Sequence, residues 1–194
     1  MRLNPPFRPA TPDDAHALAE LVDFASEGLA LYLWTKFAGP AGDPWAMGRE
    51  RALRETGSFS YRNAIVCEHE GRAAAALIGY PLARLPEPIP DTMPAMFVPL
   101  QELENLAPGT WYVNVLAAYP RHRGQGHGTA LLSLAEQQAA AAQCDGLSII
   151  VSDSNTGARR LYERCGYREQ ARRAKIKEDW HNPGTQWVLL SKLQ

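Results

Sequence analysis

A run of glycines and basic residues is the part of this sequence best suited to chemistry. Residues 121–128 read Arg-His-Arg-Gly-Gln-Gly-His-Gly, follow an apolar strand-like segment and precede a helix-like one. Glycines let a ligand approach the backbone closely, and a helix N-terminus presents unpaired N–H groups to an anion. The segment therefore predicts a site for a phosphate or a pyrophosphate.

Two familiar phosphate-binding patterns fit this run poorly. The glycines read G-x-G-x-G rather than G-x-G-x-x-G, and Asp153 lies farther beyond them than the dinucleotide fingerprint expects. A Rossmann oxidoreductase that binds NAD is therefore a weak alternative. A P-loop needs Lys-Ser/Thr after its last glycine, whereas Gly128 is followed by Thr129 and Ala130. A coenzyme A site is the third possibility.

Two motifs in the chain resemble those of the GNAT superfamily of N-acetyltransferases. The acyl-CoA signature of that family is Gln/Arg-x-x-Gly-x-Gly/Ala, and Arg123, Gly126 and Gly128 match it. The second motif, Asn-x-x-Ala-x-x-Leu-Tyr-x-x-x-Gly-Phe/Tyr, resembles Asn155–Tyr167. The clear match covers about Tyr112–Tyr167, with both motifs in the expected order. The resemblance implies acetyl-CoA as the co-substrate. No metal is expected, because the histidines show no ligand spacing.

In that family the N–H groups of the glycine loop hold the pyrophosphate of CoA, while the preceding strand pairs with the pantetheine arm. The residues matching the pyrophosphate loop are Arg123, Gly124, Gln125, Gly126, His127, Gly128 and Thr129. Leu116, Ala117 and Ala118 match the strand; the alternative is plain core strand, and both interpretations can hold together. Asn155 matches the asparagine that contacts the arm, and it is also a favourable helix N-cap.

Tyr162 matches the general acid of the family, which protonates the CoA thiolate that leaves. A phenol with a pKa of ~10 can protonate a thiol with a pKa of ~8.5. The alternative is a half-buried aromatic residue on a helix face. The general base is unassigned, because the matching positions are Tyr112, Asn114 and Ile150, of which none is a carboxylate.

An acidic loop could supply the missing base. Glu104 or Glu102 of that loop, a chain of waters, or a substrate of low pKa could each serve, although a solvated helix face is the simpler interpretation for each glutamate. Tyr112, Asn114 and Glu104 are predicted to contact the acceptor.

The elements that position these residues follow from hydrophobic periodicity, caps and turn residues. Helices are expected over 11–25, 29–37, 43–56, 101–106, 155–165 and from the glycine loop to 143, and strands over 63–68, 72–80, 110–118, 147–151, 167–177 and 185–193. This order predicts an α/β, GNAT-type fold with a mixed, mostly antiparallel central sheet flanked by helices. We expect a single domain over residues 1–194.

Composition limits the partners. The chain has 194 residues and a formal net charge of −1, which argues against a surface built for nucleic acid or for anionic lipid. Three widely spaced cysteines argue against a disulfide scaffold or a zinc site. The N-terminus has no signal-like apolar run, and no segment has the length of a membrane span. A cytoplasmic protein is therefore expected.

Together these features predict an enzyme that moves an acetyl group from acetyl-CoA to a primary amine by direct attack in a ternary complex. The acceptor would be a small-molecule amine or a protein N-terminus. One alternative is a non-catalytic CoA-binding regulatory domain, which the missing base favours. Another is a protein- or nucleic-acid-binding module that uses the basic stretch 159–177. The oligomeric state is open, and a homodimer is compatible with the sequence.

Overall fold

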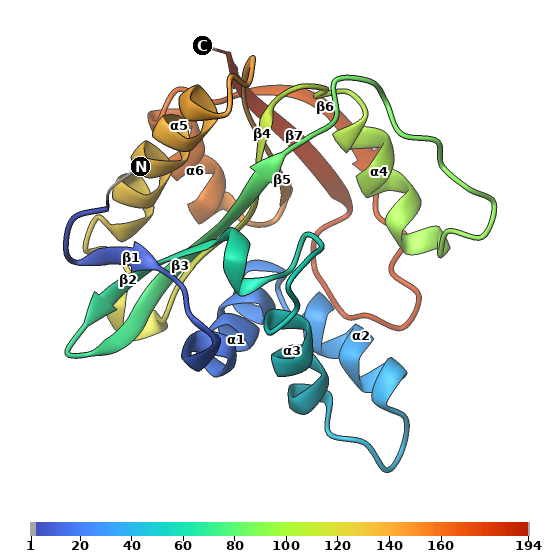
Figure 1. Ribbon diagram of the computed structural model, residues 1–194. Coiled ribbons are helices and arrows are strands. Elements are labelled where there is room, and N and C mark those ends of the chain that lie inside the picture. Colours follow the sequence, from blue (N-terminus) through green and yellow to red (C-terminus); the bar gives the residue numbers. More distant parts are fainter. Residues whose placement is uncertain (1–2, 194) are drawn as a thin grey trace. The chain divides into compact units, whose positions relative to one another are not determined.

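The computed structural model describes residues 3–193 and has an α/β fold (Figure 1). Its strands follow the order β1-β2-β3-β4-β5-β7-β6. The pairs β1–β2, β2–β3, β5–β7 and β6–β7 are antiparallel, whereas β4 and β5 are parallel. The predicted α/β fold with a mixed, mostly antiparallel sheet flanked by helices is confirmed.

The strands are β1 Phe7–Pro9, β2 Ala64–His69, β3 Arg72–Pro81, β4 Trp111–Ala118, β5 Gly146–Ser152, β6 Arg168–Ala174 and β7 Gln186–Leu193. The helices are α1 Ala15–Ala25, α2 Leu29–Ala38, α3 Pro44–Ala52, α4 Val98–Glu104, α5 His127–Ala141 and α6 Thr156–Arg164. Some expectations need correction. The helix expected over 43–56 ends at Ala52, and the strand expected over 167–177 ends at Ala174. Strand β1 was not expected, and α4 begins at Val98 rather than at 101, because Pro99 lies in its first turn, where no N–H donor is needed.

Contacts between residues in space divide the structure into two compact units. The first unit consists of Met1–Tyr80 and Asn114–Ser133, and the second of Pro81–Val113 and Leu134–Gln194. Strand β4 and helix α5 each contribute residues to both units. The expectation of a single domain over the whole chain stays a prediction.

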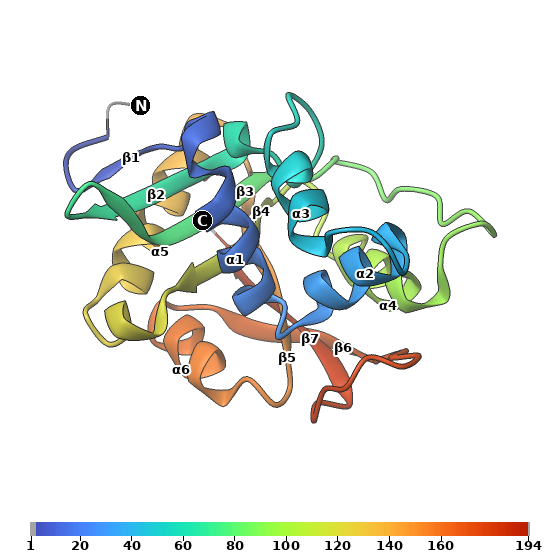
Figure 2. The ribbon, with the colours of Figure 1, turned by 90° about the horizontal axis from the view of Figure 1, so that it is seen from below.

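In the first unit, α1 and α3 cover one face of β2 and β3 (Figure 2). Leu18 and Leu21 of α1 are fully buried in one cluster with Ala52 of α3, Val66 of β2 and Ile78 of β3. Because neighbouring residues of a strand point to opposite faces, Cys67 lies on the other face of β2 from Val66. The first residue of α5 contacts Cys67 there, so the sheet of this unit has helices on both sides.

In the second unit, helices pack on both faces of β5, β7 and β6. Arg173 of β6 pairs with Glu102 of α4 at 2.6 Å, which places α4 on one face. Lys192 of β7 pairs with Glu136 of α5 at 2.6 Å, and its side chain lies close to Gly166 at the end of α6. Strand register puts Arg173 and Lys192 on opposite faces. Helix α4 and helix α6 therefore flank this part of the sheet from opposite sides (Figure 1).

A lysine ties the connection between β6 and β7 to the end of β5. The Lys175 ammonium donates hydrogen bonds to Ser152 Oγ at 2.6 Å and to Asn182 Oδ1 at 2.7 Å, and it lies 4.1 Å from the centroid of the Trp187 ring. A Cβ atom on Gly184 would lie 2.3 Å from Ser152 Oγ. This cluster therefore leaves no room for a side chain at position 184.

We expect Tyr167→Phe to stabilise the fold. The Tyr167 side chain is fully buried, and its hydroxyl has no hydrogen-bond partner among residues 3–193. A buried polar group without a partner costs ~1–3 kcal/mol, so its removal should raise the free energy of unfolding by about 1 kcal/mol. Urea denaturation followed by circular dichroism measures this difference. A loss of stability would show that the hydroxyl has a partner that the structure does not contain.

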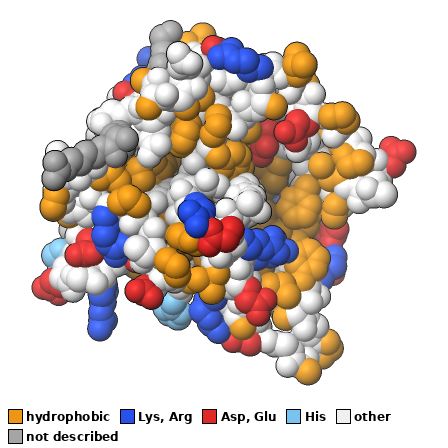
Figure 3. All heavy atoms as spheres, in the orientation of Figure 1, with side chains coloured by type: hydrophobic (Ala, Val, Ile, Leu, Met, Phe, Trp, Pro, Cys, Tyr) orange, Lys and Arg blue, Asp and Glu red, His pale blue; other side chains and the backbone are white. Residues whose placement is uncertain are grey.

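The surface agrees with the near-neutral charge of the chain. Lysine and arginine side chains are interspersed with aspartate and glutamate on the face drawn in Figure 3. Within the described range, no helix is long and apolar enough to cross a membrane. The three cysteines are free thiols.

Candidate functional site

The glycine loop of the first unit has a backbone that suits close approach of a ligand. Gly124 and Gly126 have φ values of +73° and +85°, and a Cβ atom added to either would meet nothing within 4 Å. The Ala130 N–H donates to the Gly126 carbonyl at 3.1 Å. This is the first hydrogen bond of α5. The N–H groups of residues 127–129 come before it in the chain, so they have no acceptor within the helix. The positive end of the α5 dipole reinforces them.

Arg123 is held beside this loop. Its Nε donates to the Ala118 carbonyl at 3.2 Å, and its guanidinium lies 5.9 Å from the centroid of the Phe24 ring. Gln125 bridges the loop, because its Nε2 donates to the Arg121 carbonyl at 3.1 Å. The loop thus presents an exposed, oriented cation next to free amides, which is an arrangement that binds phosphate.

The side chain of His127 points away from that anion site and into the first unit. Its Nδ1 lies 3.3 Å from Cys67 Sγ, and its Nε2 is buried without a partner in the described part of the chain. Burial raises the pKa of the Cys67 thiol, which keeps it protonated. The imidazole of His127 is thus engaged away from the loop, and a role of its backbone N–H in ligand binding stays a prediction. No cluster of three or more His, Cys, Asp or Glu residues suited to a metal occurs within 3–193.

The strand before the loop is accessible on one side. Leu116, Ala117 and Ala118 are half-buried at the end of β4, whereas Val115 is buried in the core. Asn114, two residues before Leu116 in β4, is also half-buried. Ala117 packs with Val115 against the core of the first unit, so Leu116 and Ala118 form the accessible side, and contact of these residues with a ligand arm stays a prediction.

Helix α1 supports the loop, and sequence reasoning missed this role. The Tyr119 hydroxyl donates a short hydrogen bond to the Glu20 carboxylate, and the Tyr119 ring packs edge-on against Phe24 at 5.8 Å. Burial, with Glu20 as a smaller cause, raises the pKa of Tyr119. No motif marks Glu20 or Phe24, because their partners lie about a hundred residues further along the chain.

In the second unit, the α6 motif has the predicted local structure. The Asn155 side chain caps α6, since its Oδ1 accepts from the Ala158 N–H at 3.1 Å. The N-cap interpretation of Asn155 is therefore confirmed, and its contact with CoA stays a prediction. Tyr162 is 5% exposed, and its ring lies 5.9 Å from that of Tyr167. Burial raises the pKa of Tyr162, so the phenol is protonated at physiological pH.

Tyr112 and Ile150, two of the positions expected to hold a base, lie on the face of the second unit's sheet that α4 covers. Tyr112 is buried and pairs with Ser148, and Ile150 follows on the same face as Ser148. Glu104 is half-buried on α4, and burial, with a smaller contribution from Glu87, raises the pKa of its carboxyl to about 7. A carboxyl with this pKa exchanges protons near neutral pH.

Comparison with known proteins agrees with this architecture. The model of the Acetyltransferase (GNAT) family matches residues 29–167. No curated protein sequence matches the chain. An N-acetyltransferase from Staphylococcus aureus Mu50 has a similar fold, with a TM-score of 0.65, 17% identity, and 96% of this chain and 99% of that chain covered.

Two further solved structures extend the comparison. A ribosomal-protein-alanine N-acetyltransferase from Brucella melitensis has a TM-score of 0.57 and 19% identity, covering 97% of this chain and 99% of that chain. A GNAT family acetyltransferase from Elizabethkingia anophelis with acetyl-CoA bound has a TM-score of 0.50 and 19% identity, covering 68% and 75%. The chain belongs to the acetyltransferase (GNAT) family.

Proposed function

We propose that this protein transfers the acetyl group of acetyl-CoA to a primary amine by direct attack in a ternary complex. The observation that carries the proposal is the glycine turn before α5. Two glycines with positive φ and open space at Cβ, free N–H groups at a helix start and the oriented Arg123 all favour one anionic guest. The pyrophosphate of CoA has the matching charge.

In this proposal the glycine loop, the end of β4 and Asn155 bind the donor. The backbone N–H groups of residues 124–129 and the Arg123 guanidinium hold the pyrophosphate. The backbone of Leu116, Ala117 and Ala118 lies along the pantetheine arm, and an N–H of this strand polarises the carbonyl that is attacked. The Asn155 amide has Oδ1 engaged in the helix cap, so its Nδ2 is the group left to donate to the arm.

Acetyl-CoA, when bound, supplies an acetyl thioester whose carbon–sulfur bond breaks as the amine nitrogen bonds to the carbonyl carbon. Tyr162 donates a hydrogen bond to the leaving sulfur and supplies its proton. Burial of Tyr162 keeps its phenol protonated until that moment, which is the state that a donor requires. Glu104 is our candidate for the base that accepts a proton from the bound ammonium group before attack, because its carboxyl titrates near neutral pH.

The acceptor is a small-molecule amine or a protein N-terminus. One of the similar folds is named for acetylation of alanine in a ribosomal protein. A non-catalytic CoA-binding domain is the second candidate function, and one observation favours it. Tyr112, Asn114 and Ile150 leave β4 and β5 without a carboxylate at the positions where the family often has one.

Calorimetric titration with acetyl-CoA, with NAD as the control ligand, tests the donor site first. We expect saturable, micromolar binding of acetyl-CoA and no binding of NAD. Thiol release in the presence of a panel of amines then tests transfer. Binding of acetyl-CoA without release for any amine would favour the non-catalytic function, and no binding would contradict both candidates.

A further inference from the structure

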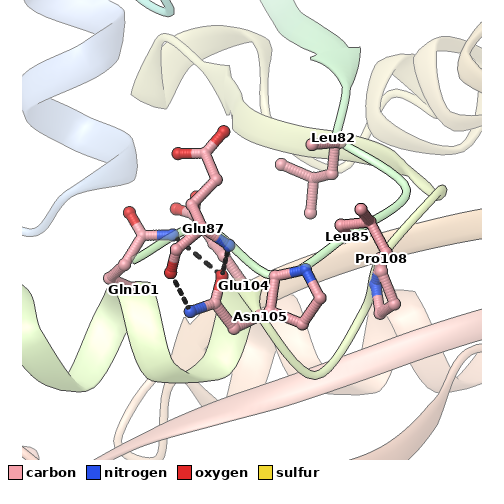
Figure 4. Close-up of a pocket in the computed structure, with 9 residues that line it drawn as sticks. Leu82, Leu85, Glu87, Gln101, Glu104, Asn105 and Pro108 are labelled. Carbon is pink, nitrogen blue, oxygen red and sulfur yellow. Dashed lines mark hydrogen bonds between the residues drawn. The ribbon is translucent and has the colours of Figure 1, made fainter. Parts of the chain in front are cut away.

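An open pocket in the second unit lies between α4 and the segment that follows β3 (Figure 4). It encloses about 250 Å³ of space, counting the part continuous with solvent. Gln101 and Asn105 line it from the side of α4, and Leu82, Leu85 and Pro108 line it from the opposite side (Figure 4). Leu85 is 78% exposed, so the rim of the pocket presents apolar surface to solvent.

The polar groups of the pocket differ in how well they are paired. The Asn105 side chain is engaged on both sides, since its Oδ1 accepts from the Glu87 N–H at 2.9 Å and its Nδ2 donates to the Glu87 carbonyl at 2.8 Å. Gln101 Nε2 donates to the same Oδ1 at 3.3 Å. The Glu104 carboxylate, in contrast, has no hydrogen bond or ion pair with any residue in the described part of the chain.

Glu102, on the same helix, differs from Glu104 in having a cationic partner. Glu102 has Arg173 as its partner at 2.6 Å, whereas Glu104 is half-buried beside a second acid, Glu87. A buried carboxylate is ordinarily paired, and an unpaired one carries a desolvation cost that a cation would offset. The cation nearest to Glu87 in the sequence, Arg84, is already paired with Asp145 at 3.1 Å.

We propose that this pocket binds the acceptor, and that it selects an alkyl- or arylalkylammonium compound. The ammonium group pairs with Glu104, with Glu87 as the second carboxylate, while the apolar part of the acceptor lies against Leu82, Leu85 and Pro108. A metal ion is a poorer guest, because two carboxylates among apolar walls offer too few oxygen ligands. This inference rests on the proposed function, to which it adds the class of the acceptor.

The affinity for such an amine should depend on pH in a defined direction. Burial raises the pKa of the free Glu104 carboxyl to about 7, whereas an alkylammonium stays charged to above pH 9. Binding needs the ionised carboxylate, so the apparent affinity should rise about tenfold between pH 6 and pH 8. The other charged groups nearby are Glu87 and the ion pairs Glu102–Arg173 and Arg84–Asp145.

The test uses the full chain without acetyl-CoA, titrated with n-pentylamine and with the neutral 1-pentanol. Backbone amide shifts in NMR spectra report binding at residues 82–87 and 101–105. We expect the amine to bind at least tenfold more tightly than the alcohol at pH 8. Glu104→Gln should lose this preference and the dependence on pH. Glu102→Gln is the matched control on the same helix, and it should keep both.

Equal binding of amine and alcohol, or a preference that survives in Glu104→Gln, would overturn the proposal. Shifts confined to residues outside the pocket would also overturn it. The outcome is separate from that of the proposed function, because it needs no turnover. Amine binding at the pocket without thiol release would contradict the proposed transferase function and support the acceptor pocket. Acetyl transfer without shifts at the pocket residues would support the transferase function and contradict the acceptor pocket.

Discussion

Replacing Tyr162 with phenylalanine should lower kcat for acetyl transfer about 100-fold and leave the Kd for acetyl-CoA within twofold of the parent. The change removes one oxygen from a side chain that is 5% exposed and leaves the ring in its contact with Tyr167. General acid catalysis contributes ~10²–10⁴-fold to rate, so the loss should fall in kcat rather than in binding. Steady-state kinetics by thiol release, with calorimetry for acetyl-CoA, measure the two quantities.

Tyr167→Phe is the matched control for this experiment. The second tyrosine is also buried, and its ring centroid lies 5.9 Å from that of Tyr162, so both variants lose a hydroxyl from the same environment. Its kcat should stay within twofold of the parent. Equal kcat in Tyr162→Phe and the parent would remove Tyr162 from the mechanism, and equal losses in both variants would indicate a packing effect.

Gly126→Ala should weaken acetyl-CoA binding about 30-fold without unfolding the protein. The residue has a φ of +85°, and the space above its Cα is open, so the added methyl group would occupy the surface that a phosphate must approach. Loss of charge-assisted hydrogen bonds from the loop is worth ~2 kcal/mol, which corresponds to about 30-fold in Kd. Calorimetry with acetyl-CoA measures this change.

Gly71→Ala is the control that distinguishes a loss of acetyl-CoA affinity from an effect of backbone strain. Gly71 lies in the turn between β2 and β3 with a φ of +75° and, like Gly126, has nothing within 4 Å of an added Cβ. Both variants therefore carry a similar cost of about 1 kcal/mol in stability. Only Gly126→Ala should change the Kd. A similar rise in Kd for both variants would contradict a specific role of the glycine loop.

The parts of the site that could be predicted are those whose structure is local. A strand, a glycine turn and a helix start are contiguous in sequence, so the geometry of residues 116–129 follows from neighbouring residues. The Asn155 cap is equally local, since its partner is Ala158. Their roles toward acetyl-CoA came from resemblance to the family, and these roles stay predictions.

The rest of the site depends on contacts between distant residues. Glu20 and Tyr119 are 99 positions apart, and no periodicity or motif connects them. The difference between Glu102 and Glu104 also arises in three dimensions, because only the first meets Arg173 of β6. Strand β1 is too short to show alternation, and it forms because its backbone pairs with β2.

The interleaving of the two units determines what a single proteolytic cut can do. Each unit is assembled from two separate stretches of chain, and residues 83–88, near the start of the second unit, are exposed. A cut there leaves Leu18 and Val66 on one fragment and Val115 on the other, although all three share one buried cluster. Breaking that peptide bond removes no core contact. The two fragments should therefore remain a non-covalent complex in native buffer and separate only in denaturant.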